Sequence, residues 1–246
     1  MAIVESGTTG TNGVMERERA LADLVRLGGG LVVSCQARED NPLHGSPFMA
    51  AMARAAMLGG AAGIRADGVN DVAPIREVIP SEAPIIGIFK VKQRDGSVFI
   101  TPSGESARNV LQAGARLVAL DGTPRSRPGG EQLRDVIAAI HQAGGGALAD
   151  IGTFDDALHA VDCGADAVGT TLSGYTPDSP KLPGPDFPLL ERLARELPVP
   201  VFAEGRIWTP EEARRALDLG AAFVVVGTAI TNPMAITARF TAQMST

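Results

Sequence analysis

The stretch Gly220-Ala221-Ala222-Phe223-Val224-Val225-Val226-Gly227 places a glycine–alanine pair directly before a continuous apolar run. Such a run is typical of a strand that is buried on both faces of a parallel sheet. The segment before it begins Thr209-Pro210-Glu211-Glu212, with a threonine N-cap, proline at the first helical position and acid in the first turn. The sequence therefore predicts a helix, a glycine turn and a buried strand, in that order.

The same glycine–alanine pair recurs around the chain, each time between a helical pattern and an apolar run. The pairs are Gly60-Ala61, Gly114-Ala115, Gly164-Ala165 and Gly220-Ala221, at intervals of 54, 50 and 56 residues. A βα unit averages about 30 residues when 246 residues hold eight units, so each interval spans two units. The pairs therefore indicate an internal repeat that returns at every second strand.

Eight apolar runs alternate with helical patterns along most of the chain. The runs cover residues 30–36, 62–65, 85–90, 117–121, 147–151, 167–171, 199–204 and 223–227; the helical patterns cover 47–58, 106–113, 131–142, 153–162, 189–196 and 209–219. This alternation predicts an α/β protein, a single-domain (β/α)8 TIM barrel over residues 15–246. Residues 1–14, rich in Gly, Thr and Ser, are expected to form a flexible tail. A doubly wound open sheet is the alternative, but no GxGxxG motif lies at a strand–helix junction.

Composition excludes several classes of function. The chain has 29 Gly and 17 Pro, about 19% of 246 residues against an average near 12%, yet 45% is hydrophobic, which excludes a disordered or collagen-like chain. The net charge of −6 and the small aromatic content (8 Phe, 1 Trp, 1 Tyr) argue against nucleic acid as a partner. We find no signal peptide and no membrane-spanning run, and we expect a cytoplasmic protein. Two distant cysteines and three scattered histidines without HExxH predict neither a disulfide scaffold nor a metal site.

Polar residues follow several of the runs at the ends where TIM barrels hold their active sites. They are Gln36, Arg65, Lys90, Asp121, Asp150 and Glu204. A single charge in such a place is ordinarily a solvated rim residue, but six at corresponding positions favour a site. Low-dielectric surroundings would lower the pKa of Lys90 and raise that of Glu204, which favours proton transfer near neutral pH.

The last two strands end in glycines where barrels of this kind commonly bind phosphate. Gly205-Arg206 and Gly227-Thr228 would offer backbone N–H groups and one guanidinium to the anion, although a glycine there can also be a plain loop residue. His44, in the loop after the first strand, and Tyr175, after the sixth, are further candidate ligand contacts. Cys35 alternates away from Gln36 and is expected to pack under a helix.

Several motifs together resemble one enzyme family, from about residue 31 to residue 240. They are Ser34-Cys35-Gln36, Pro42-Leu43-His44, Gly63-Ile64-Arg65-Ala66, Gly87-Ile88-Phe89-Lys90, Ala149-Asp150-Ile151, Gly169-Thr170-Thr171-Leu172-Ser173-Gly174-Tyr175-Thr176 and Ala203-Glu204-Gly205. They are similar to the N-acylglucosamine-6-phosphate 2-epimerases, the NanE family. The resemblance implies a TIM barrel that interconverts N-acetylmannosamine 6-phosphate and N-acetylglucosamine 6-phosphate in sialic acid and amino-sugar catabolism, with no metal or other cofactor.

By the same motifs, the resemblance implies catalytic roles for Lys90 and Glu204. It also implies sugar contacts for Gln36, Arg65 and Asp150. The chain departs from the family pattern at Asn232, where the family usually has an arginine near the phosphate loop. A Schiff-base aldolase acting through Lys90 and a sugar-phosphate-binding barrel without turnover remain alternatives. The sequence sets no oligomeric state; a homodimer is one expected state, because such barrels often self-associate.

Overall fold

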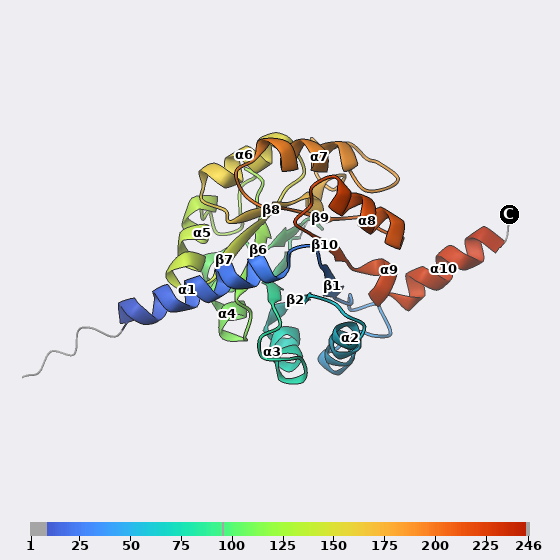
Figure 1. Ribbon diagram of the computed structural model, residues 1–246, viewed down its shortest axis with the longest axis horizontal. Helices are drawn as coiled ribbons and strands as arrows, with labels where there is room; N and C mark the ends of the chain where they lie inside the picture. Colours follow the sequence, from blue (N-terminus) through green and yellow to red (C-terminus); the bar gives the residue numbers. More distant parts are fainter. Residues whose placement is uncertain (1–8, 95, 245–246) are drawn as a thin grey trace, which may run out of the picture.

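The computed structural model describes residues 9–94 and 96–244, and its central feature is a closed barrel of eight parallel strands (Figure 1). In barrel order the strands are β1 (Leu31–Cys35), β2 (Gly63–Asp67), β3 (Ile85–Ile88), β6 (Leu117–Asp121), β7 (Gly146–Asp150), β8 (Ala167–Gly169), β9 (Val201–Glu204) and β10 (Phe223–Val226). The predicted TIM barrel is therefore confirmed.

Helices precede, connect and follow the strands, and most of them surround the barrel (Figure 1). They are α1 (Thr9–Arg26), α2 (Ser46–Leu58), α3 (Gly68–Val78), α4 (Gly104–Gln112), α5 (Leu133–Gln142), α6 (Phe154–Asp162), α7 (Phe187–Glu196), α8 (Pro210–Asp218), α9 (Thr228–Thr231) and α10 (Pro233–Met244), with a 3-10 helix η1 (Thr170–Leu172) after β8. The sequence patterns missed α1, α3, α9 and α10. The tail expected over 1–14 overlaps α1, which is helical from Thr9; residues 1–8 lie outside the described residues.

The four repeated glycines end helices in one shared geometry. Gly60, Gly114, Gly164 and Gly220 all have positive φ, between 93° and 110°. At each site the following alanine N–H bonds to the carbonyl five residues earlier, as Ala221 does with Ala216. This is the Schellman motif, in which glycine adopts the left-handed conformation at little cost. The internal repeat thus marks the helix ends before β2, β6, β8 and β10.

Side chains that alternate along each strand fill the barrel interior or the layer beneath the helices. The interior contains Phe202 and Phe223, whose rings stack with centroids 5.0 Å apart. Leu24 of α1 and Leu27, the residue that follows this helix, join the interior cluster, so α1 covers the barrel at the end opposite the strands' carboxyl ends. The barrel therefore remains open at the carboxyl ends of the strands, where a binding site can form.

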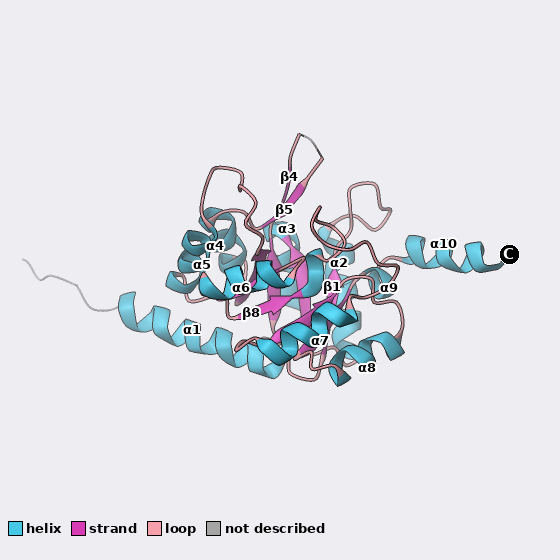
Figure 2. Cartoon of the chain, turned by 90° about the horizontal axis from the view of Figure 1, so that it is seen from above, coloured by secondary structure: helices cyan, strands magenta, loops and turns pink. Residues whose placement is uncertain are grey.

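The third barrel strand ends earlier than the sequence predicts. β3 stops at Ile88, and the chain enters an antiparallel hairpin of β4 (Lys90–Lys92) and β5 (Val98–Ile100) (Figure 2). The expected strand over 85–90 is therefore wrong at its last two residues. Lys90 begins the hairpin instead of ending a barrel strand, and this places it on the rim of the barrel mouth.

The last helix stands apart from the barrel. Both ribbon views show α10 projecting from the body beyond α9 (Figures 1 and 2). No described residue of α10 is buried. None of the described helices is long and apolar enough to span a bilayer.

Candidate active site

A cavity of about 1000 Å³ opens at the carboxyl ends of the strands. This volume lies at the upper end of the range for small-molecule sites. Most of the predicted site residues line it: Gln36, His44, Lys90, Tyr175, Glu204, Gly205, Arg206, Gly227 and Thr228. Arg65 and Asp150 do not, because their side chains are 1% and 0% exposed and lie below the lined surface.

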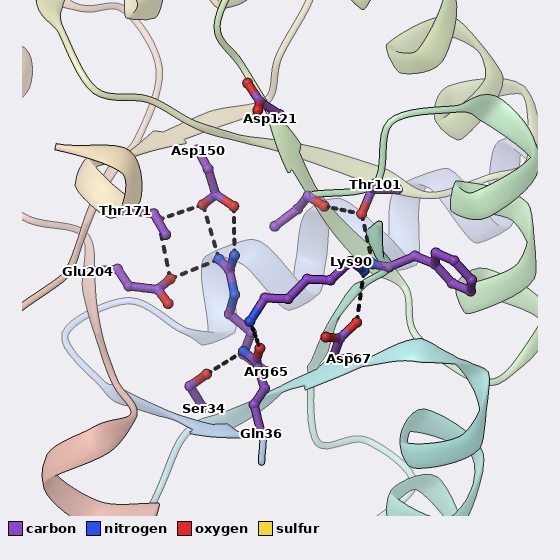
Figure 3. Close-up of polar contacts among 12 residues, drawn as sticks. Ser34, Gln36, Arg65, Asp67, Lys90, Thr101, Asp121, Asp150, Thr171 and Glu204 are labelled. Atoms are coloured by element: carbon purple, nitrogen blue, oxygen red, sulfur yellow. Dashed lines mark hydrogen bonds and ion pairs between the residues drawn. The ribbon is translucent and has the colours of Figure 1, made fainter. Parts of the chain in front are cut away.

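Arg65 is the centre of a buried network of charges under the cavity (Figure 3). Its Nη1 and Nη2 donate to the two carboxylate oxygens of Asp150 at 3.1 and 2.6 Å. Nη1 also lies 2.8 Å from Oε2 of Glu204. Two carboxylates on one guanidinium hold Arg65 in its charged form and raise its pKa. The Arg65 Nε, by contrast, is buried without a hydrogen-bond partner.

Glu204 ends β9 and has an unusual carboxyl group. Its side chain is 14% exposed, and burial raises its pKa to about 7. Arg65 opposes this rise, whereas the nearby Asp150 charge adds to it. At neutral pH the group can therefore both accept and donate a proton.

Lys90 is placed by contacts at both its backbone and its amine. The backbone N–H donates to Oδ1 of Asp67 at 2.9 Å, and the Nζ amine donates to Oε1 of Gln36. Gln36 in turn donates to Ser34 Oγ at 2.7 Å. The side chain is exposed in the open mouth of the barrel, yet the protein around the amine desolvates it and lowers its pKa. The Asp67 charge opposes this lowering of the pKa, and the Arg65 charge adds to it.

The candidate phosphate end lies between the loops after β9 and β10. Gly205 has φ of 114° and Arg206 has φ of 57°, so the backbone turns sharply behind Glu204. The Arg206 Nε donates to the Gly184 carbonyl at 2.7 Å, and Nη1 donates to that of Ser173. These bonds fix the guanidinium at the cavity wall. A Cβ on Gly227 would lie 3.3 Å from that of Ser34, so glycine lets the β10 loop pass close to β1.

Four other residues singled out in the sequence are also placed by the structure. His44 Nδ1 lies 3.0 Å from the Ala37 carbonyl, and the Tyr175 ring lies against Arg206. Asp121 is fully buried and accepts hydrogen bonds from Thr123 and Arg125. It lies apart from the Arg65 network in Figure 3 and does not line the cavity. Cys35 is buried in the layer that contains residues of α2, as predicted, and burial raises its pKa to about 12.

Two residues near Lys90 and Glu204 escaped the sequence analysis. Asp67 faces Lys90, and Thr171 contacts both Asp150 and Glu204. Asp67 follows Arg65 by two residues on the same strand, so strand alternation could have pointed to it. Thr171 sits within a motif already noted, but nothing local distinguishes it from Thr170.

Comparison with known proteins places these residues in a family context. The family model NanE, described as "Putative N-acetylmannosamine-6-phosphate epimerase", matches residues 49–246. A curated relative from Clostridium perfringens, described as "Putative N-acetylmannosamine-6-phosphate 2-epimerase", is 50% identical over 221 residues, 90% of this chain and 98% of its own. A relative of the same description from Cutibacterium acnes is 47% identical, over 88% of this chain and 94% of its own.

Solved structures agree with the sequence comparison. The N-acetylmannosamine-6-phosphate 2-epimerase of Clostridium perfringens superposes with a TM-score of 0.86 at 49% identity, over 89% of this chain and 95% of that one. A thiamine phosphate pyrophosphorylase from Pyrococcus furiosus, at 18% identity and a TM-score of 0.59 over 86% of this chain and 90% of that one, shares the fold alone. The barrel, the residues at its mouth and these similarities lead to one conclusion: the chain belongs to the NanE family of N-acetylmannosamine-6-phosphate epimerases.

Proposed function

We propose that this protein interconverts N-acetylmannosamine 6-phosphate and N-acetylglucosamine 6-phosphate, a step of amino-sugar and sialic acid catabolism, by proton transfer at C2. The observation that carries the proposal is the pair of Lys90 and Glu204. Both line one cavity, and the pKa of the amine is lowered while that of the carboxyl is raised. C2 inversion requires one acid and one base, and these opposite pKa shifts bring the two groups closer in strength.

The reaction inverts C2 next to the aldehyde of the open-chain sugar. One group removes the C2 proton, the electron pair moves into the enolate, and the other group returns a proton to the opposite face. Lys90 and Glu204 fill these two roles, and the Lys90 cation also faces developing negative charge. Gln36, His44 and Tyr175 line the cavity as contacts for the sugar. Arg65, which Asp150 holds in place, acts through the Glu204 carboxyl that it contacts.

The 6-phosphate fits the wall formed by the last two loops. Gly205 and Gly227 bring backbone close to the cavity, and Thr228 begins the short α9 beside it. Arg206 supplies positive charge from a fixed position. Asn232 lines this wall where the family pattern has an arginine, so we expect weaker phosphate binding than in relatives that have the arginine.

The decisive experiment follows both sugar phosphates by NMR in D2O. We expect interconversion with deuterium entering C2, and rates at least about 10²-fold lower in Lys90→Ala and Glu204→Gln. Near wild-type rates and exchange in both variants would refute the roles of the two residues. Borohydride in the presence of substrate tests the aldolase alternative, since it would trap an imine on Lys90 only if one forms. The unphosphorylated sugar serves as the control for phosphate recognition.

We further propose that the protein is a homodimer in which α10 packs on a second copy of the chain. The helix exposes Met234 (54%), Phe240 (67%) and Met244 (83%), and Phe240 and Met244, which are four residues apart, form one exposed apolar face. Light scattering after size exclusion should give twice the chain mass of 25.4 kDa. Phe240→Glu combined with Met234→Glu should shift it toward the monomer, and a wild-type monomer would contradict the proposal.

We also propose that the enzyme acts in the cytoplasm. Both cysteines, Cys35 and Cys163, are free thiols buried in the protein, which suits a reducing compartment. Fractionation of cells that produce the protein should recover it with cytoplasmic markers, and recovery with the envelope would contradict this.

A further inference from the structure

Two consecutive threonines after β8 form hydrogen bonds with Glu204 of the neighbouring strand. Thr170 contacts its backbone and Thr171 contacts its side chain. Thr170 Oγ1 donates to the Glu204 carbonyl at 2.9 Å and accepts from its N–H at 3.2 Å. Thr171 Oγ1 lies 2.5 Å from Oδ1 of Asp150 and 3.3 Å from Oε2 of Glu204. Thr170 therefore places the residue, and Thr171 touches the group that titrates.

Arg65 and Thr171 contact the same two carboxylate oxygens (Figure 3). Arg65 Nη1 meets Asp150 Oδ1 and Glu204 Oε2, and so does the Thr171 hydroxyl. Glu204 Oε2 is therefore surrounded by two donors, whereas Oε1 has no hydrogen bond to any residue within 9–94 and 96–244. Because a donor-filled oxygen is a poor site for a proton, the exchangeable proton of Glu204 belongs on Oε1.

The Thr171 hydroxyl has one hydrogen and two carboxylate oxygens within reach. Asp150 accepts two hydrogen bonds from Arg65, and its Oδ1 is also within reach of the Thr171 hydroxyl as an acceptor. An ionised Glu204 attracts the hydrogen to Oε2, and a neutral Glu204 attracts it less. The direction of this hydroxyl can therefore follow the charge on Glu204 with no movement of heavy atoms.

We propose that Thr171 is a positioning residue whose hydroxyl hydrogen turns to Glu204 Oε2 when Glu204 is ionised and to Asp150 when Glu204 is protonated on Oε1. The inference rests on the proposed epimerase function and on Glu204 as one of its proton-transfer groups. When Glu204 takes the C2 proton, the C–H bond breaks, its electron pair stays on the sugar as the enolate, and the proton goes to Oε1. Lys90 protonates the other face, and exchange with solvent restores both groups.

Three variants separate this role from a structural one. Thr171→Val removes the hydroxyl at nearly constant shape, so the acid limb of the kcat profile should move up by about one pH unit. At pH values below that limb, kcat of Thr171→Val should be about tenfold lower than that of the wild type, with KM nearly unchanged. Thr171→Ser should restore the wild-type limb. Thr170→Val, the matched control, loses the backbone contacts and should lower thermal stability without moving the limb.

The proposal is wrong if Thr171→Val keeps the wild-type limb, or if Thr170→Val moves it equally. It is also wrong if serine fails to restore the limb. A readout that needs no turnover keeps the inference separate from the proposed function. In protein carrying ¹³C-labelled glutamate, with Glu204→Gln to assign the signal, the Glu204 carboxyl should titrate at higher pH in Thr171→Val even if the wild type proves inactive.

Discussion

Asp67 accepts a hydrogen bond from the backbone N–H of Lys90 at 2.9 Å, and the two charged side chains interact at the rim of the cavity. This contact joins the last residue of β2 to the first residue of the β4–β5 hairpin. One carboxylate therefore does two things: it anchors the backbone of the lysine, and it is the largest influence that keeps the amine protonated against the effect of burial.

The double role of Asp67 can be separated by Asp67→Asn. The amide oxygen still accepts the Lys90 N–H, but the negative charge is lost. We expect the pKa of Lys90 to fall further, so the alkaline limb of the kcat profile should move down, by about one pH unit. Asp67→Leu, which also removes the acceptor, should in addition lower kcat at every pH. An unmoved alkaline limb in Asp67→Asn would exclude an electrostatic role for Asp67.

The wild-type enzyme should show a bell-shaped dependence of kcat on pH. Below the acid limb both Lys90 and Glu204 are protonated and no base is present; above the alkaline limb both are deprotonated and no acid is present. Because Glu204 has a pKa of about 7, we place the acid limb there. The alkaline limb should lie below the ordinary lysine value of 10.5, because burial lowers the pKa of Lys90. A rate that is constant from pH 5 to pH 9 would contradict this assignment.

The ionised carboxyl of Glu204 should also lower the free energy of unfolding above neutral pH. Its carboxyl binds a proton more tightly in the folded chain than in the unfolded chain, so stability falls as pH rises from about 4.5 to about 7. Glu204→Gln keeps an acceptor for Arg65 and removes this titration. We expect the free energy of unfolding of the variant, relative to that of the wild type, to be about 2 kcal/mol higher at pH 8 than at pH 5. Urea unfolding at both pH values measures the gain, and equal differences at both would disprove it.

Asn232 offers a test of phosphate recognition. Its Oδ1 accepts from the Ala235 N–H at 3.1 Å, which caps α10, and from Asn41 Nδ2 at 3.3 Å. Asn232→Arg should lower KM for the sugar phosphate about three- to tenfold, because it adds a cation to the wall. It should also cost about 1 kcal/mol of stability, since the cap is lost.

Asn232→Asp is the matched control for this change. It retains an acceptor for the cap but adds a negative charge, so KM should rise. The KM for the unphosphorylated sugar should respond to neither variant. Equal effects on both sugars would place Asn232 outside the phosphate site.

Much of the barrel was predictable because its signals are local. The run over 223–226 is apolar on both faces, and Gly220 takes a conformation that few other residues adopt, so the strand and the turn before it can be read from neighbouring residues. The same reasoning pointed to Lys90 and Glu204, because polar residues stand at corresponding ends of six apolar runs. It placed the end of β3 two residues too late, because Phe89 extends the apolar run up to Lys90 while the chain already turns into the hairpin.

The chemistry of the site depends on contacts that no local pattern contains. Arg65 meets Asp150 across 85 residues, and Thr171 meets Glu204 across 33. The position of α10 away from the barrel is equally non-local, because its composition suits packing on this chain or on another.

The positions of the strands along the chain, the turn conformations and the residues at the strand ends are specified by short-range hydrophobicity and backbone preference, and these are properties of adjacent residues. Closure of the barrel decided which carboxylate lies against Arg65, which hydroxyl serves Glu204 and which aspartate faces Lys90. These pairings set the pKa values, because desolvation and Coulomb interactions depend on distances in space and not on separation along the chain.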